Sequence, residues 1–184
     1  MITFKNHHDA KRVLGVLGKR FARYGLTLHP DKTRLIDFRP ERKGGTHPDC
    51  TEPPFDFLGF SHIWAKSQKG KNVVRQRTAK SRLARALVAI NDWCRTHRHH
   101  PIPYQRNRLA AKLLGHYTYY GITGNIAQLQ QYYHQVKRTW RKWLARRTRS
   151  GRLPWEKFRA LLARHPLPSP AIRHRYVAVS EPRS

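Results

Sequence analysis

The sequence predicts an α+β chain in which a small lobe of one helix and antiparallel strands is followed by a β-hairpin and a basic bundle of three helices. Two runs typical of strands, SHIWAK and NVVRQRT, flank the turn sequence SQKGKN, which predicts the hairpin. Beyond residue 78 the apolar residues recur with helical spacing. A hydrophobic content of 39% indicates that the chain folds rather than remaining disordered.

The first lobe, about residues 1–77, is predicted from short strand, helix and turn signals. Its first elements are expected in this order: a strand end at residues 2–5, a helix capped by Asp9 and ended by Gly25, a turn at Pro30 and Asp31, a strand over residues 33–38 and a loop over residues 39–54. FDFLGF, residues 55–60, then resembles a strand because its side chains alternate, although Gly59 weakens it. The hairpin, with Gly70 in its turn, completes the lobe.

The second segment, about residues 78–150, is predicted to form three helices. Each has one apolar stripe, and the stripes contain, in order, Leu83, Leu87, Ile90 and Cys94; Leu109, Leu113, Leu114 and Tyr117; and Ile126, Leu129, Tyr133, Val136, Trp140 and Trp143. RHHPIP separates the first two helices, and Asn125 is placed to cap the third. A short helix around Trp155 and an extended tail are expected over residues 151–184.

The positive charge lies mainly beyond the first lobe. The formal net charge is +28, and residues 63–184 hold 27 basic but only 3 acidic side chains. A solvated surface usually mixes both signs, so this excess predicts a polyanionic partner, of which nucleic acid is the first candidate. An anionic membrane is the rival, but no segment reaches the roughly 18 apolar residues of a spanning helix. Two cysteines and no signal-peptide pattern in the first residues predict a cytoplasmic protein.

The histidines and cysteines give only a weak indication of a metal site. His47 with Cys50, and Cys94 with His97, each have the spacing of half a zinc site. The chain has 12 histidines, so such spacings arise by chance, and Cys94 falls on an apolar stripe. We therefore expect no metal or other cofactor in this chain.

Several stretches resemble the C-terminal part of the reverse transcriptases, or maturases, that group II introns encode. They are GLTLHPDKTRLIDF at 25–38, FDFLGF at 55–60, LLGHYTYYGITGN at 113–125, VKRTWRKWLARR at 136–147 and LPSPAIRH at 167–174. The first two resemble the end of that family's palm, including its glycine hairpin beside the primer. The others resemble its thumb, or maturase-specific domain, so the resemblance covers almost the whole chain.

The resemblance implies that the chain binds RNA. In the full-length family, which is an RNA-directed DNA polymerase that uses Mg²⁺, this part grips the template–primer duplex and docks on the intron RNA for splicing and retrohoming. The family's tyrosine-x-Asp-Asp loop would lie a few residues before Met1, and no two acidic residues are adjacent in this sequence. Phosphoryl transfer by two metals needs clustered carboxylates. This chain alone is therefore not expected to polymerise, and no catalytic residue is assigned.

Two other functions stay open at this point. A stand-alone basic RNA-binding protein of ribosomal type would need no catalytic partner, and its residues 57–60 would be plain core. A split RNA-directed DNA polymerase would be completed by a separate chain that carries the rest of the palm.

The candidate site residues fall into three groups. By resemblance, Lys32 and Thr33 support the palm, and a nucleic-acid backbone approaches the hairpin formed by Phe57, Leu58, Gly59 and Phe60. The alternative for Gly59 is a bulge or close packing against the helix of residues 9–24. In the second segment, side chains suited to stacking on bases and contacting phosphates are Tyr119, Tyr120, Tyr132, Arg138, Arg141, Lys142, Arg146 and Arg147. Trp140 and Trp143 lie on an apolar stripe and are expected in the core.

Overall fold

The computed structural model of the chain describes residues 2–38, 54–67, 69–147 and 151–175. The chain splits into two compact units, residues 1–53 and 54–184, and each is described by itself. The described residues form helices and one three-stranded antiparallel sheet, which confirms the predicted α+β class. The predicted boundary at residues 77–78 lies inside the second unit, because the hairpin and the helical bundle belong to the same unit.

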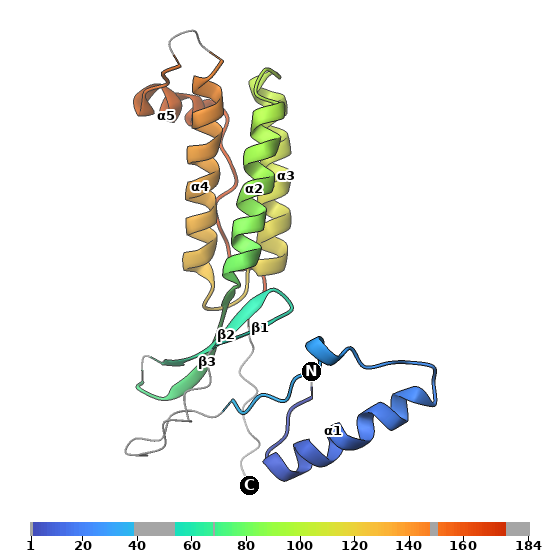
Figure 1. The fold of residues 1–184 in the computed structure, drawn as a ribbon. Helices are drawn as coiled ribbons and strands as arrows, with labels where there is room; N and C mark the ends of the chain where they lie inside the picture. Colours follow the sequence, from blue (N-terminus) through green and yellow to red (C-terminus); the bar gives the residue numbers. More distant parts are fainter. Residues whose placement is uncertain (1, 39–53, 68, 148–150, 176–184) are drawn as a thin grey trace. The chain divides into compact units, whose positions relative to one another are not determined.

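The first unit contains the helix α1 (His7–Ala22) and a short 3-10 turn, η1 (Pro30–Lys32) (Figure 1). Gly25 follows α1 with a φ of +66°, the left-handed conformation that commonly ends a helix. The prediction that Asp9 caps the helix is wrong, since α1 begins two residues earlier and Asn6 precedes it. Asp9 lies in the first turn, where its carboxylate accepts a hydrogen bond of 3.2 Å from the Asn6 side chain. A negative charge at this position still favours the helix through the helix dipole.

The two strands predicted for the first unit do not form. Residues 2–5 and 33–38 lie outside every strand, and the described sheet consists of other segments. A strand is stable only where a neighbouring strand satisfies its backbone hydrogen-bonding groups. The local pattern identified residues suited to strands, but no described strand pairs with them.

The first unit buries little apolar surface. Among residues 2–38 only Ala10 is fully buried. Seven large apolar side chains of this range are exposed, namely Ile2, Phe4, Leu14, Val16, Tyr24, Leu26 and Leu35. Because apolar burial is the main favourable term in folding, this unit has a weak core of its own.

The second unit begins with the sheet, whose strands are β1 (Phe55–Phe57), β2 (Phe60–Lys66) and β3 (Asn72–Thr78) in that order. The predicted β2–β3 hairpin is confirmed, and Gly70 takes a φ of +72° in its turn. FDFLGF is not one strand, because Phe57 pairs with Phe60 across a two-residue turn. Leu58 and Gly59 both have positive φ, 48° and 82°, as the tightest hairpin turn requires.

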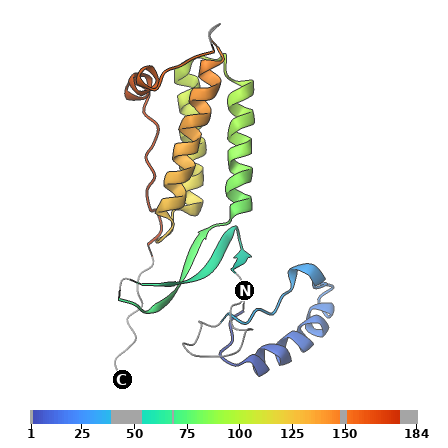
Figure 2. The same ribbon diagram turned by 60° about the vertical axis from the view of Figure 1, so that its left-hand side comes forward.

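Three long helices form the bundle, namely α2 (Lys80–Thr96), α3 (Ile102–Tyr120) and α4 (Ile126–Ala145), and they lie side by side in both views (Figures 1 and 2). The short α5 (Trp155–Arg164) follows, as predicted. One side chain from most turns of each helix enters a common core that includes Leu83, Ile90, Cys94, Leu109, Leu113, Leu129, Val136, Trp140 and Trp143. These residues confirm most of the predicted stripes, the two tryptophans included. Leu114 and Ile126, also predicted on the stripes, are exposed, so for these two the prediction is wrong.

The described tail after α5 runs back along the bundle (Figure 2). Arg106 of α3 donates a hydrogen bond of 2.8 Å to the carbonyl of Pro166, and Leu167 is buried. Farther along, the backbone N–H groups of Arg173 and His174 donate to the carbonyl of Gly121, at 2.7 and 2.9 Å. Gly121 is the close crossing point, because a Cβ there would lie 2.2 Å from the Tyr117 carbonyl oxygen and 3.0 Å from that of Ala171.

We predict that the first unit exchanges its amide hydrogens faster than the bundle does. Its exposed apolar side chains leave α1 with little burial to oppose local opening, whereas α4 is packed against the core. Hydrogen exchange followed by mass spectrometry on the whole chain measures this. Slower exchange in residues 7–22 than in residues 126–145 would contradict the prediction.

Replacing Gly121 by alanine is expected to lower the free energy of unfolding of the second unit by about 1–3 kcal/mol, since the added methyl group meets backbone atoms on two sides. Gly115→Ala is the matched control, because Gly115 lies inside α3 with open space around it. That change should stabilise the unit by about 0.5–1 kcal/mol. Urea unfolding of both variants tests the pair, and equal effects would show that neither the backbone of α3 nor that of the tail crowds Gly121.

Candidate nucleic-acid interface

The β1–β2 turn packs against the C-terminal end of α3. The Tyr119 hydroxyl donates a hydrogen bond of 2.8 Å to the Leu58 carbonyl. The ring of Phe60 stacks on that of Tyr119 at 5.8 Å between centroids and meets the edge of the Tyr120 ring at 5.3 Å. The structure therefore brings the hairpin residues and two of the three candidate tyrosines, about sixty positions apart in sequence, into one group. We call residues 57–60 with Tyr119 and Tyr120 the turn cluster.

The close neighbour of Gly59 is a tyrosine of the bundle. A Cβ built on Gly59 would lie 3.0 Å from the Tyr120 hydroxyl oxygen and 3.6 Å from Cγ of Arg82. Within the second unit, Gly59 therefore packs closely against α3 and α2. Approach of a nucleic-acid backbone to this turn stays a prediction. The Leu58 side chain, 68% exposed, lies at the tip of the turn.

Asn125 fixes the sheet to the bundle. The prediction that it caps α4 is wrong, because its side chain makes no capping hydrogen bond. The amide oxygen instead accepts a hydrogen bond of 3.0 Å from the backbone N–H of Thr78, and the amide nitrogen donates to the Thr78 hydroxyl at 2.8 Å and to the Tyr120 carbonyl at 2.9 Å. Asn125 and Thr78 are both buried. No local sequence signal distinguishes such an anchor from a cap.

The candidate cations of α4 divide into an exposed row and a structural residue. Arg138, Lys142 and Arg146 are exposed and lie four residues apart, so they share one face of the helix. We call these three the α4 row. Arg147 is exposed as well, and its guanidinium donates a long hydrogen bond of 3.4 Å to the His100 carbonyl.

Arg141 has a different environment from the α4 row. Its guanidinium lies 4.2 Å from the centroid of the Trp155 ring and donates a hydrogen bond of 2.7 Å to the Leu153 carbonyl. It is half-buried. These contacts join α4 to the segment leading into α5, so this side chain is engaged within the protein rather than directed at solvent.

Tyr132 is buried, in contrast to the other two candidate tyrosines. It is 3% exposed, and its ring stacks on His116 at 3.9 Å between centroids. Burial raises the pKa of its hydroxyl to about 12 and lowers the pKa of His116 to about 4, so both are uncharged at neutral pH. The ring of Tyr132 therefore has no accessible face for a base, and the expectation that it contacts nucleic acid is corrected. Tyr119, by contrast, is 53% exposed.

Two arginines that sequence reasoning did not select lie beside the turn cluster. Arg82 and Arg85, both exposed on α2, are close enough to Tyr120 to oppose the rise in its pKa that burial and Tyr119 cause. Their spacing of three residues on one helix face is a sequence signal that could have identified them. They place positive charge next to the aromatic rings.

The remaining candidates belong to the first unit or to the core of the bundle, or fall outside the described residues. Lys32 is exposed in η1, and Thr33 follows it, half-buried, with its N–H donating to the His29 carbonyl at 3.0 Å. His47 and Cys50 fall outside the described residues. Cys94 is buried in the bundle core, where burial raises its pKa to about 12. Across residues 2–38, 54–67, 69–147 and 151–175, no three His, Cys, Asp or Glu side chains come together as a metal site would require.

Comparison with known protein families, curated proteins and solved structures gives no match to this chain. None of the described helices has a stretch long and apolar enough to cross a membrane.

A Gly59→Ala variant tests the close contact in the turn cluster. Gly59 and Gly70 both have positive φ, but only Gly59 has a neighbour within 4 Å, so Gly70→Ala measures the backbone strain alone. We expect the Gly59 variant to lose about 1 kcal/mol more than the Gly70 variant in free energy of unfolding.

Removing the Tyr120 hydroxyl should cancel that extra loss. In a double-mutant cycle with Tyr120→Phe, the two changes are therefore expected to be non-additive. Additive losses, measured by chemical unfolding, would show that the hydroxyl does not limit the space at Gly59.

Proposed function

We propose that this chain binds RNA as the C-terminal part, end of palm plus thumb, of a group II intron reverse transcriptase/maturase. The proposal rests on one observation: the turn cluster packs on a bundle whose outer surface is cationic. The resemblance of the hairpin to a glycine hairpin beside the primer supports it, since the turn lies on the thumb-like helices. In this proposal the chain grips a template–primer and docks on intron RNA, and its residues position the RNA rather than make or break bonds.

The charges of the second unit favour a polyanion. Its described acidic residues are Asp56, Asp92 and Glu156, and two of them already have partners. The Asp56 carboxylate accepts a hydrogen bond from Ser61, and that of Asp92 lies 4.0 Å from the Arg95 guanidinium. The α4 row and the arginines beside the turn cluster therefore have few acidic groups available to neutralise them. Phosphates supply the missing negative charge, and their contacts dominate nucleic-acid affinity.

The turn cluster offers a complementary kind of contact. Tyr119 presents a half-exposed ring, and Leu58 presents an apolar side chain at the tip of the turn. Hydrogen bonds from Tyr119 and Ala79 hold this turn in place. The N–H of Ala79 donates to the Gly59 carbonyl at 2.9 Å, which fixes the turn at the start of α2. A surface positioned in this way can contact ribose and base while arginines contact phosphate.

A second candidate function is a split RNA-directed DNA polymerase completed by a separate palm-bearing chain. The weak core of the first unit favours it, because a lobe that buries little apolar surface by itself gains stability from packing against another protein. Primer extension by the chain mixed with a palm that carries the Asp pair, but by neither part alone, would support this function. A stand-alone RNA-binding protein would bind RNA identically with and without that palm.

RNA affinity is expected to depend steeply on salt. If six to ten phosphates are neutralised, the association constant should fall about 10³–10⁵-fold between 50 and 200 mM salt. The triple variant Arg138→Gln, Lys142→Gln, Arg146→Gln removes the α4 row and should reduce the slope of log K against log[salt] by about 2–3. Fluorescence anisotropy with a labelled RNA measures both quantities.

A matched control changes three exposed cations of α5, with Lys157→Gln, Arg159→Gln and Arg164→Gln. This variant has the same net charge, and we expect it to reduce the slope less than removal of the α4 row does. A salt-independent association constant for the parent protein would contradict RNA binding by phosphate contacts. Equal slopes for the two triple variants would show that the α4 row contacts RNA phosphates no more than the cations of α5 do.

A further inference from the structure

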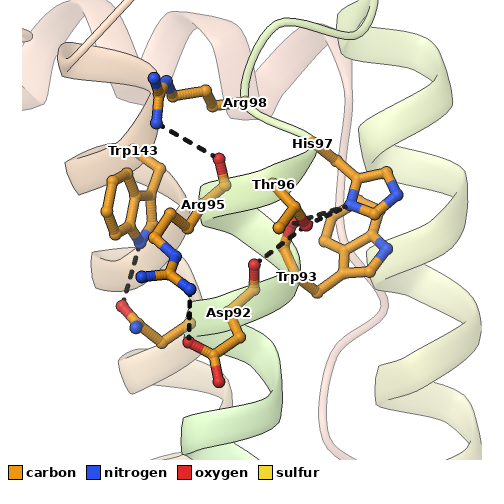
Figure 3. A network of polar contacts seen from close by, with 8 residues as sticks. Asp92, Trp93, Arg95, Thr96, His97, Arg98 and Trp143 are labelled. Carbon is orange, nitrogen blue, oxygen red and sulfur yellow. Dashed lines mark hydrogen bonds and ion pairs between the residues drawn. The ribbon is translucent and has the colours of Figure 1, made fainter.

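Four aromatic rings stack on one another where α2 ends and α3 begins. We call Trp93, His97, His100 and Tyr104 the ring ladder. The centroid distances are 4.7 Å for Trp93–His97, 5.3 Å for His97–His100 and 4.9 Å for His100–Tyr104, with interplanar angles of 12°, 29° and 29°. The ring centroid of His97 also lies 6.5 Å from that of Tyr104, so the last three rings form a cluster rather than a straight column. Figure 3 shows the first two members, Trp93 and His97, on one side of α2 and Trp143 on the other. Offset-stacked rings at these separations attract one another.

The backbone around the ring ladder is held by buried polar groups. Gln105, 1% exposed, donates hydrogen bonds from its side-chain nitrogen to the carbonyls of His100 and Arg98, at 2.7 and 3.1 Å. Its side-chain oxygen accepts a hydrogen bond of 2.9 Å from the Trp140 indole in the core. The ring of His97 is fixed in turn by contacts of its Nδ1 with the Thr96 hydroxyl and the Trp93 carbonyl (Figure 3). The ladder is therefore positioned before any ligand arrives, which lowers the entropic cost of binding one.

The outer end of the ladder faces solvent. His100 is exposed, and Tyr104 is 36% exposed, whereas Trp93 and His97 are half-buried. Packing that merely closed the turn between two helices would bury these rings, as the core buries Trp140. An exposed aromatic face is the feature on which proteins stack unpaired bases.

Cations surround the ladder. The guanidinium of Arg108 lies 5.5 Å from the centroid of the Tyr104 ring, and the ammonium of Lys112 lies 5.8 Å from that of Trp93. Across the helix end, Arg98 approaches the ring of Trp143, beside which Lys142 and Arg146 of the α4 row also lie. A chain of phosphates bound to the α4 row can therefore pass Arg98 and reach the ladder.

We propose that the ring ladder is a stacking site for an unpaired base of single-stranded RNA. The base takes the place of Arg108 on the ring of Tyr104, beside the exposed His100, and the Arg108 guanidinium moves to the adjacent phosphate. Stacking tolerates every base because each has a π face, so the site selects unpaired over paired nucleotides rather than one sequence. The proposal rests on the proposed function, since it assumes that this chain binds RNA, and it adds a site at the end of the bundle remote from the turn cluster.

The test compares Tyr104→Leu with Tyr104→Phe. Leucine removes the ring and phenylalanine keeps it, while neither change alters the charge of the protein. The probe is an unstructured single-stranded RNA of about 12 nucleotides, and the comparison ligand is a blunt duplex of the same sequence. We expect Tyr104→Leu to weaken binding of the single strand about 5- to 150-fold, with the salt slope and the duplex affinity unchanged. Tyr104→Phe should bind both ligands as the parent protein does.

Other results would overturn the proposal in distinguishable ways. Equal affinities of the leucine and phenylalanine variants for the single strand would show that no base stacks on Tyr104. An equal loss with the duplex would show that the ring serves the fold or a phosphate contact. If the parent shows a steep salt dependence while the Tyr104 variants bind normally, only the ladder proposal fails. If the parent binds neither RNA at 50 mM salt, the proposed function fails as well.

A second variant covers the case in which Tyr104→Leu does not fold. His100→Ala removes an exposed ring, and the Gln105 hydrogen bond to the backbone carbonyl of His100 does not depend on that ring. We expect it to weaken single-strand binding in the same direction, again without effect on the duplex. A folded His100→Ala protein with parental single-strand affinity would count against the site.

Discussion

The side-chain amide of Asn125 determines how the two parts of the second unit meet. A short sheet is marginally stable by itself, so it needs a surface on which to pack. Asn125 joins the end of β3 to the turn between α3 and α4 with three hydrogen bonds, two of them to Thr78. Because these atoms are buried, loss of the amide would leave donors and acceptors unsatisfied, at about 1–3 kcal/mol each. This anchor places the β1–β2 turn on Tyr119 and Tyr120, and every contact proposed there depends on it.

Three ionisable groups inside the bundle of the second unit are uncharged at pH 7, and its cations lie on the outside. Cys94, His116 and Tyr132 lie in the bundle, where burial shifts each pKa so that the neutral form dominates at pH 7. A charge in that interior would lose its hydration without a partner to replace it. The arginines and lysines instead occupy the outer faces, where few acidic groups balance them. Their mutual repulsion opposes folding, and a bound polyanion would relieve it.

The parts of the fold that depend on local periodicity could be predicted from the sequence. The hairpin around Gly70 and most members of the three helix stripes depend on residues close together in the chain, and the structure confirms them. Leu114 and Ile126 are the exceptions, because both are exposed. The strands expected at 2–5 and 33–38 depend on a partner strand, which local sequence does not specify. Local sequence is equally silent about the role of Asn125. A polar residue just before a helix predicts a cap, whether its side chain bonds to the helix backbone or to another part of the fold.

The candidate site could be predicted in part, and the misses have identifiable causes. On α4 both Tyr132 and Tyr133 fit a helical stripe that begins at Leu129, with spacings of three and four residues respectively. Tyr132 rather than Tyr133 is buried because its ring stacks on that of His116 on α3. Tyr133 is left half-buried, with the Lys137 ammonium 4.4 Å from its ring centroid. Arg141 is likewise distinguished from its basic neighbours only by Trp155, which lies fourteen residues farther along.

Because α4 runs along the bundle, its cations lie in sequence between the end with the sheet and the end with the ring ladder. α4 starts at the sheet, where Asn125 contacts Thr78, and ends near the α2–α3 turn, where Arg147 reaches the His100 carbonyl. The α4 row therefore leads from the middle of the bundle to the end that carries the ring ladder (Figure 1). The 17 residues of α2 separate the two aromatic surfaces by about 25 Å, a distance fixed by helix geometry. An RNA bound along the α4 row would therefore meet the ring ladder at one end of the bundle. It would reach the turn cluster only if it extended along the whole length of α2 to the opposite end.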